Sequence, residues 1–597
     1  MRILFCALHF GAFRNYEPAI RTLAARGHQV HLTGDIPDVL GGQALVERLA
    51  VDCPSITWSM APSLEGWPWQ RLADRVRGGL ETVRFADSAY DDQPKYRSRS
   101  LPRAPWIVAA ITHSHAGRAL AAPVLRAVER GIPPPRTLVT WMRGQAPDVV
   151  LLASVTNGGA PQMDHLKAAL TLGLPVSLPV YSWDHLSGKA VLHVVPSQVL
   201  VWNETQQREA VTLHGLPAER VVVTGAYGYE QWLSRTPSRS RESFCAACGL
   251  DPARTVLVYV CSVLSRPAPP EAPFVLAWIR ALRASADPVL REAGILVRPH
   301  PERLEEWDGV SFEGLGTVVL RGRNPIDPDA KDEYFDTLHY ATAVVGVLTS
   351  AFIEAAVVGR PSLVIEAPEF REHQEGAPHY HYLRDPGNGL LLTAGDFEGH
   401  LKQLSRVVAG DQAVRVRTAA FVDRFVRPPA GHRSASETFA AAVETLVERQ
   451  SASGASRPGQ FGAGVPRLAA ELLRGLDQIP VGRRLLRNER DRIVDARKVE
   501  VHHRREHRAA DRDRRQAVEE RERAAREQAK AERVREKQAR IDARERDRAA
   551  LKAQRERERA GKRAALEQRN RARAAENARS ARRRRWRALL RRLRLGS

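Results

Sequence analysis

Short apolar segments alternate with helical segments along most of this chain, and this alternation constrains the fold more than any other feature. Residues 2–8 are an apolar run, residues 14–26 have helical spacing that Gly27 ends, and residues 29–33 again have a strand pattern. A strand, a helix and a second strand in this order form a βαβ unit, whose strands pair in parallel. The sequence therefore predicts parallel sheets with helices on both faces.

The alternation occurs in two runs separated by a break rich in Ser and Arg at residues 234–242. The first run continues with strand patterns at residues 148–153, 176–181, 199–202 and 221–224 and a helix at 204–214. The second has strand patterns at residues 255–264, 295–298, 343–348 and 362–366 and helices at 273–285 and 350–358. We expect an α/β protein with two tandem Rossmann-like, doubly wound domains, residues 1–232 and 240–425, whose ligands lie beyond the carboxyl ends of the strands.

Three further segments follow the second predicted domain. Residues 426–450 predict a helix that crosses back over both domains, and residues 451–490 read as a linker with a short amphipathic helix from about 466. Residues 491–597 hold 38 Lys and Arg against 19 Asp and Glu, so they carry +19 of the net charge of +22. The basicity of the protein therefore belongs to its tail, and the rest of the chain is close to neutral.

The tail predicts a long charged helix. Its heptad positions are not kept apolar, so a solvated single helix is favoured over a strong coiled coil. At its end, Trp586, Leu589, Leu590 and Leu593 share one helical face among arginines, which is typical of a helix lying on an anionic membrane surface. Binding of RNA or DNA is the competing use of the same arginines.

The cysteines and apolar segments bear on metal binding and on location. Five cysteines, at positions 6, 53, 245, 248 and 261, favour a reducing compartment. The pair at 245 and 248 has no second pair nearby at ligand spacing, and no Asp-x-Asp motif follows a strand, so no metal or other cofactor is expected. No apolar run approaches the roughly 20 residues that span a bilayer, so we expect a cytoplasmic protein, with the tail as its contact to the inner face of the membrane.

The second predicted domain has the residue types that bind a nucleotide. Thr349 and Ser350 follow a strand and can cap the next helix, where backbone amides hold phosphate, although the same pattern is common in helix caps that bind nothing. Glu354, one turn later, suits the ribose hydroxyls. Arg298 and His300 follow another strand, and the prolines on both sides of His300 hold it where it can donate to phosphate oxygens or to a leaving group.

Two of these segments resemble a known group of enzymes. LVRPHP at residues 296–301 and TSAFIEAAVVGRP at 349–361 resemble the donor-binding half of bacterial surface-polysaccharide glycosyltransferases of the two-Rossmann-domain GT-B type, including sialyltransferase-like and capsule-synthesis enzymes. Related signatures occur in CDP-glycerol glycerophosphotransferases and UDP-N-acetylglucosamine 2-epimerases. The resemblance implies that His300 contacts the donor phosphate, that Thr349 and Ser350 cap phosphate and that Glu354 holds ribose. The segment at residues 259–283 resembles the first strand and loop of the donor domain and places Ser262, Ser265 and Glu271 near the site.

The first domain would hold the acceptor and, in an inverting enzyme, the base that removes its proton. Related plant and macrolide glycosyltransferases have a His just before a Pro in the first βα loop, whereas this chain has HFGAFRNYEP there, with Arg14 and Asn15 near the expected place. Asp184 in SWDH is our first candidate base and His9 the second, although each suits a loop cap or a packed strand end equally well. Arg14 can instead face phosphate or an acidic acceptor.

These observations predict transfer of a sugar from a nucleotide-activated donor to a surface polysaccharide or glycolipid. Two enzymatic alternatives stay open: transfer of a polyol phosphate from a CDP-linked donor, and epimerisation of a UDP-sugar. A non-enzymatic alternative is a degenerate scaffold whose basic tail binds nucleic acid or membrane.

Overall fold

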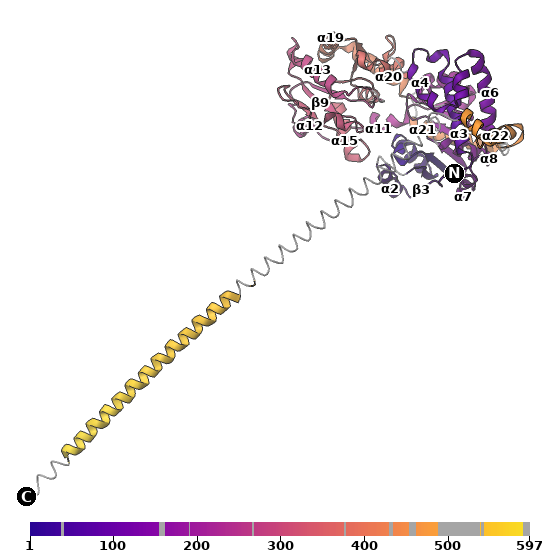
Figure 1. Ribbon diagram of the computed structural model, residues 1–597. Coiled ribbons are helices and arrows are strands. Elements are labelled where there is room, and N and C mark those ends of the chain that lie inside the picture. Colours follow the sequence, from indigo (N-terminus) through magenta and orange to yellow (C-terminus); the bar gives the residue numbers. More distant parts are fainter. Residues whose placement is uncertain are drawn as a thin grey trace, which may run out of the picture. The chain divides into compact units, whose positions relative to one another are not determined.

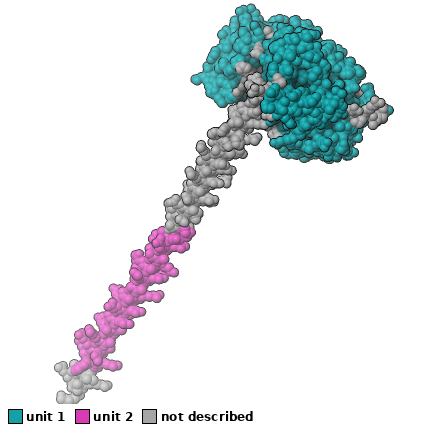
Figure 2. All heavy atoms as spheres, turned by 45° about the vertical axis from the view of Figure 1, so that its right-hand side comes forward, with its two compact units in different colours: residues 1–493 teal, residues 494–597 magenta. Residues whose placement is uncertain are grey.

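The computed structural model describes ten stretches of the chain: 1–36, 41–153, 161–189, 191–264, 268–374, 378–428, 434–452, 461–486, 538 and 542–588. They fall into two compact units, Met1–Ile493 and Val494–Ser597 (Figure 2). Unit 1 contains both sheets, and each unit is described by itself.

The first sheet has seven parallel strands in the order β3-β2-β1-β4-β5-β6-β7. Its strands are β1 (Arg2–Ala7), β2 (Gln29–Gly34), β3 (Ile56–Met60), β4 (Val149–Leu152), β5 (Val176–Pro179), β6 (Gln198–Val201) and β7 (Val221–Val223). The apolar run of β1 pairs on both sides, with Ile3 opposite Val30 of β2 and Val149 of β4, so it is buried as a central parallel strand requires.

The second sheet has six parallel strands in the order β10-β9-β8-β11-β12-β13. They are β8 (Val256–Val260), β9 (Gly294–Arg298), β10 (Val318–Leu320), β11 (Ala343–Gly346), β12 (Ser362–Ile365) and β13 (Leu392–Ala394). In both sheets the strand order reverses beside the first strand, so both are doubly wound, as the sequence predicts.

Helices cover both sheets (Figure 1). On the first sheet lie α1 (Glu17–Ala25), α2 (Gly42–Asp52), α8 (Gln162–Thr171) and α10 (Glu204–His214). The second sheet carries α12 (Arg241–Cys248), α13 (Ala272–Arg283), α15 (Pro328–Tyr340), α16 (Ala351–Val357), α19 (Phe397–Val408) and α20 (Gln412–Phe425). The expected helix at 204–214 is confirmed residue for residue.

A helical insertion between β3 and β4 was not foreseen from the sequence. It contains α3 (Gln70–Phe85), α4 (Pro94–Ser100), α5 (Trp106–Ile111), α6 (His115–Gly131) and α7 (Arg136–Gln145). Apolar side chains of α3, α5 and α6 form a core of their own, separate from the cores under the sheets. The first domain is therefore a doubly wound sheet with a helical layer added to it.

The segments after the second sheet return to the first domain. Helix α21 (Ala435–Ala452) packs on α1, and Gln198 of β6 donates to its Ala442 carbonyl at 3.3 Å. The sequence predicted a helix lying across both domains, and the contacts of α21 with α1 and β6 belong to the first. Helix α22 (Gly464–Leu476), within the predicted linker region, packs on α6 and adds Ala470 to the core of the insertion.

In unit 2, residues 542–588 form one helix with nearly every side chain exposed. Trp586 is 63% exposed, whereas Leu589, Leu590 and Leu593 lie outside the described residues. In the part of the chain that the structure describes, no helix is long and apolar enough to cross a membrane.

Candidate functional site

Most of the predicted donor residues follow strands of the second sheet at its carboxyl edge. Ser262 follows β8, His300 follows β9, and Thr349 and Ser350 follow β11. Since β8 and β11 are the neighbours at which strand order reverses, this is the edge where doubly wound sheets bind ligands.

Arg14 brings the first domain to this edge. It lies in the turn η1 (Phe10–Asn15) after β1, and its guanidinium donates to Asn324 Oδ1 of the second domain at 3.2 Å. Its positive charge adds to the lowering that burial causes in the pKa of His300, and it opposes the rise that burial causes in the pKa of Glu354. Arg14, His300 and Glu354 therefore gather at the domain boundary, and we call them the Arg14 group.

His300 is a hydrogen-bond donor in its neutral form. Burial lowers its pKa, and the charges of Arg14 and Arg303 lower it further. Its Nδ1 accepts the Glu302 N–H at 3.2 Å, so the proton of the neutral ring resides on Nε2. A neutral imidazole whose Nε2–H has no hydrogen-bond partner among the described residues can donate to an oxygen acceptor such as a phosphate.

Glu354 is partly buried on α16, where the Tyr334 hydroxyl donates to its carboxylate. Burial raises its pKa, while Tyr334, Arg14 and Arg298 pull in the opposite direction. A carboxylate held by one phenol at a domain boundary retains an oxygen that can accept from ligand hydroxyls.

Arg298 and Ser262, both predicted to bind the donor, are occupied within the protein. Arg298 is 5% exposed, bonds both oxygens of Glu333 at 3.1 Å and lies over the Tyr334 ring at 4.6 Å. The Ser262 hydroxyl is 1% exposed and accepts the Leu348 N–H at 3.1 Å. Both side chains position the loops around the site, and their direct contact with a donor stays a prediction.

The predicted helix cap is made by one residue of the pair. Thr349 Oγ1 accepts the Ala351 N–H at 3.3 Å, whereas exposed Ser350, at the N-cap position with helical backbone angles, makes no capping bond. A capping side chain needs an extended backbone to turn toward the helix amides, and Ser350 has φ −65° and ψ −20°. Ser350 therefore does not act as the expected cap. Ser265 lies outside the described residues.

Glu271 is buried beneath this edge. Burial raises its pKa to about 7, and it accepts the Ser262 N–H at 2.6 Å and the Tyr259 hydroxyl at 3.1 Å. Its position near the site agrees with the sequence analysis, but its oxygens hold the β8 loop.

Asp184, the first candidate base, is stabilised in its ionised form by its neighbours. Burial would raise its pKa, but Lys189 at 3.3 Å and the nearby His379 and His185 lower it well below the usual range. Ser182 also donates to it at 2.5 Å. A carboxylate so stabilised accepts a proton weakly. His9, the second candidate, is partly buried immediately after β1 and before Arg14.

Beside Asp184, an interdomain carboxyl escaped the sequence analysis. Glu209 of α10 accepts the hydroxyl of Tyr382, from α18 (Pro378–Arg384) of the second domain, at 2.8 Å. Burial raises the pKa of Glu209 to about 7, and its Oε2 is buried without a hydrogen-bond partner among the described residues. Nothing in the sequence links residues 173 positions apart, so only the tertiary contact identifies this pair.

A second carboxylate missed by the sequence analysis lies at the end of β2. Asp35 is bonded by His165 Nε2 at 2.6 Å, and Cys6 of β1 lies beside the same ring. Burial would lower the pKa of His165, but Asp35 and Cys6 raise it well above its usual value. His165 and Cys6 are fully buried, so these contacts hold β1, β2 and α8 together.

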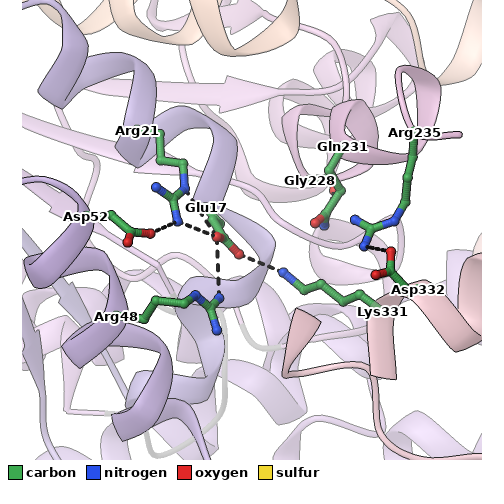
Figure 3. A network of polar contacts seen from close by, with 9 residues as sticks. All are labelled: Glu17, Arg21, Arg48, Asp52, Gly228, Gln231, Arg235, Lys331 and Asp332. Atoms are coloured by element: carbon green, nitrogen blue, oxygen red, sulfur yellow. Dashed lines mark hydrogen bonds and ion pairs between the residues drawn. The ribbon is translucent and has the colours of Figure 1, made fainter. Parts of the chain in front are cut away.

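An ion-pair network joins the two domains near the Arg14 group (Figure 3). Glu17 of α1 binds Lys331 of α15 at 2.6 Å and Arg21 at 3.1 Å, and Arg21 also binds Asp52 at 2.7 Å. Burial would raise the pKa of Glu17, but Lys331, Arg21 and Arg48 lower it. These residues line an interdomain pocket of about 480 Å³. Since the cations drawn there have carboxylate partners, the network clamps the domains together.

Among the described residues, no group of three or more His, Cys, Asp or Glu side chains is placed to hold a metal ion. Cys245 and Cys248 are buried free thiols on α12.

Comparisons with known proteins give matches of structure alone. No family model matches the sequence, and no curated protein matches it. Similar solved structures include the UDP-GlcNAc 2-epimerase of Neisseria meningitidis, which is 11% identical with a TM-score of 0.43 over 75% of this chain and 100% of that one. A putative UDP-N-acetylglucosamine 2-epimerase of Listeria monocytogenes is 10% identical with a TM-score of 0.45, covering 75% and 97%. A glycosyltransferase of Rickettsia africae is 10% identical with a TM-score of 0.42, covering 75% and 98%. The fold itself is established by the two strand orders: this chain is an α/β protein with two Rossmann-like domains in tandem.

Proposed function

We propose that this chain is a glycosyltransferase that moves a sugar from a nucleotide-activated donor to an acceptor at the boundary of its two domains. The observation that carries the proposal is the Arg14 group, in which a cation from the first domain bonds Asn324 and lies within electrostatic range of a histidine and a carboxylate of the second.

The Arg14 group supplies what a nucleotide donor needs. Arg14 and the Nε2–H of His300 would contact the phosphate oxygens, and Glu354 would accept from the ribose hydroxyls. In the reaction, the acceptor hydroxyl attacks the anomeric carbon and the bond from that carbon to the phosphate oxygen breaks. The nucleotide leaves with the bonding electrons, and Arg14 and His300 would stabilise the charge that develops on it.

A base must take the proton of the acceptor hydroxyl in an inverting reaction. Asp184 and His9 are the two candidates, and the lowered pKa of Asp184 favours His9. We propose a surface polysaccharide or glycolipid as the acceptor, on the resemblance of residues 296–301 and 349–361 to enzymes that build such polymers.

The proposed place of action is the inner face of the cytoplasmic membrane, with the basic tail as a contact. Vesicle binding that falls on Trp586→Glu would support this use of the tail. Tail-dependent binding to RNA that falls steeply with added salt would instead favour the nucleic-acid alternative.

A donor panel tests the function. Purified full-length protein is incubated with UDP-, GDP-, CDP- and CMP-linked donors, and released nucleotide is measured with and without added acceptor glycans. We expect slow hydrolysis of one nucleotide class, accelerated by the acceptor. A product that keeps its nucleotide but has an inverted sugar centre would establish epimerisation instead. If the protein neither binds nor turns over any of these donors, the enzymatic proposal is overturned.

A further inference from the structure

Exposed apolar side chains are concentrated on one part of unit 1. They lie on α5, α6, α22 and the adjoining α23 (Pro480–Leu486), helices that contact one another. The most exposed members of this surface are Trp106, Leu120, Val124, Val465, Leu468, Leu472, Ile479 and Val481. We call it the α5–α6–α22 face; α6 and α22 lie side by side in Figure 1.

Helix α22 is apolar on two sides. Ala469, Ala470 and Leu473 pack on the core of the helical insertion. Leu468 and Leu472, one turn apart, are 64% and 71% exposed. A contiguous exposed apolar surface costs free energy in water unless something covers it, and such surfaces mark sites of interaction.

The charges around this face have one sign. Between Gln93 and Pro147 the sequence has nine Lys and Arg residues and one acid, Glu129. That acid is buried and bound to Arg77 at 3.0 Å, so the exposed ionised groups of α6, such as Arg126 and Arg130, are cations.

The acids of the neighbouring α22 segment are neutralised by ion pairs. Glu471 pairs with Arg467 at 2.5 Å and with Arg474 at 3.1 Å, and Asp477 pairs with Arg75 at 2.5 Å. The surface thus presents leucines, valines and a tryptophan bordered by arginines with almost no free negative charge.

We propose that the α5–α6–α22 face docks on an anionic lipid bilayer. Its apolar side chains would enter the boundary between headgroups and acyl chains, Trp106 would lie at headgroup level, and Arg126 and Arg130 would bind lipid phosphates. Each cation close to such a surface contributes about 1 kcal/mol, or about fivefold in affinity. This surface belongs to the folded unit, is distinct from the basic tail, and does not depend on the proposed sugar transfer.

Vesicle sedimentation with the full-length protein tests the proposal. The vesicles are phosphatidylcholine alone or phosphatidylcholine mixed with phosphatidylglycerol. We expect binding to the mixed vesicles, weakened about tenfold or more by the double variant Leu468→Glu and Leu472→Glu, because each leucine loses its transfer into the bilayer. The double variant Arg126→Glu and Arg130→Glu should weaken binding to the mixed vesicles only.

A matched control introduces the same charges elsewhere. Val51 and Val416 are 81% and 58% exposed on α2 and α20, and changing both to Glu should leave vesicle binding unchanged. A bilayer-sensitive dye on Leu472→Cys should shift its emission to shorter wavelength on adding vesicles, whereas a dye on Val51→Cys should not. The two single Cys variants still report on bilayer contact if the double Glu variant fails to fold.

Two results would overturn the proposal. Unchanged vesicle binding by the Leu468→Glu, Leu472→Glu variant, together with an unshifted dye at position 472, would assign any binding to the tail. Self-association of the wild-type protein without lipid that the same variant abolishes would make the face a contact between two copies of this chain.

Discussion

The two domains share a doubly wound topology but bury their charges in different places. In the second domain, buried or partly buried charged groups such as Arg298, Glu271 and Glu354 lie at the carboxyl edge of the sheet. In the first, the most deeply buried ion pairs hold the helical insertion, where Arg77 of α3 binds Glu129 of α6 at 3.0 Å and Asp164 of α8 at 2.6 Å. In the second domain, buried charged groups hold the loops at the carboxyl edge of the sheet, where ligands are expected. In the first domain, they hold the added helical layer in place.

The largest expected effect concerns stability in the first domain. Burial would lower the pKa of Arg77, but Asp164 and Glu129 raise it, and Lys167 at 3.2 Å completes the network around Glu129. Arg77→Met would leave buried carboxylates short of a partner and should cost about 3–5 kcal/mol in the free energy of unfolding. Urea denaturation measures this loss.

Arg71→Met, at an exposed position of the same helix, is the control and should cost less than about 0.5 kcal/mol. If the two variants were equally stable, the buried network would not fasten the insertion.

A smaller effect concerns the interdomain contact of Glu209 with Tyr382. Its pKa in the folded protein, about 7, lies above that of an unfolded glutamate, so its contribution to stability is present at low pH and is lost as pH rises through about 7. The change amounts to about 3 kcal/mol at most. Glu209→Gln should flatten the dependence of unfolding free energy on pH between 5 and 8, measured by urea denaturation.

The groups that face Glu209 are Tyr382, Arg84, Asp184 and Ser187. Because Tyr382 belongs to the second domain, the titration of Glu209 tests the contact between the two domains. Glu271→Gln should remove a comparable contribution within the second domain, where burial also raises the pKa to about 7. Glu398→Gln, with a side chain 81% exposed, should leave the profile as it is. Superimposable profiles for Glu209→Gln and wild type would contradict the raised pKa.

The next effect concerns ligand affinity at the second sheet. His300→Ala and Glu354→Ala should each weaken binding of the cognate nucleotide about tenfold to a hundredfold, because each removes a hydrogen bond in which one of the two groups is charged. Calorimetric titration measures affinity, and thermal unfolding shows that the fold is kept.

His115→Ala and Glu398→Ala are matched exposed controls away from the strand ends and should bind as wild type does. Unchanged affinity in both site variants would move the donor site away from the Arg14 group.

The smallest effect concerns the tail. Because the side chains of residues 542–588 are almost all exposed, deleting residues 494–597 should change the unfolding free energy of the remaining unit by less than about 0.5 kcal/mol. Chemical denaturation of the shortened and full-length chains makes this comparison. A loss above about 1 kcal/mol would show that the tail contributes to the folded unit.

The central strands of both sheets follow from sequence because they are continuous apolar runs between turn residues, as at residues 2–8 and 343–348. The missed strands β3, β10 and β13 are edge strands, and β10 and β13 have three residues each. Edge strands pair on one side only and need no long apolar run, so their pattern is weak. The insertion helices were missed because they interrupt the alternation of strands and helices between β3 and β4.

The site was foreseen in part for similar reasons. Position after a strand predicts which loops meet at the carboxyl edge, and this places His300, Thr349 and Glu354 there. It does not predict which side chains also bind within the protein, as Arg298 binds Glu333 and Ser262 binds Leu348.

The sequence by itself determined the class of fold, the two-domain order, the location of the charge in the tail and the loops at the ligand edge, because periodicity and composition are local properties. Only the tertiary structure decided that Arg14 reaches Asn324, that Glu209 meets Tyr382 across the boundary, and that α22 returns to the insertion and leaves Leu468 and Leu472 exposed. Those outcomes depend on contacts between residues far apart in the chain, and it is burial and partner charges at such contacts that set the pKa, the free hydrogen-bonding groups and the exposed surface of each side chain.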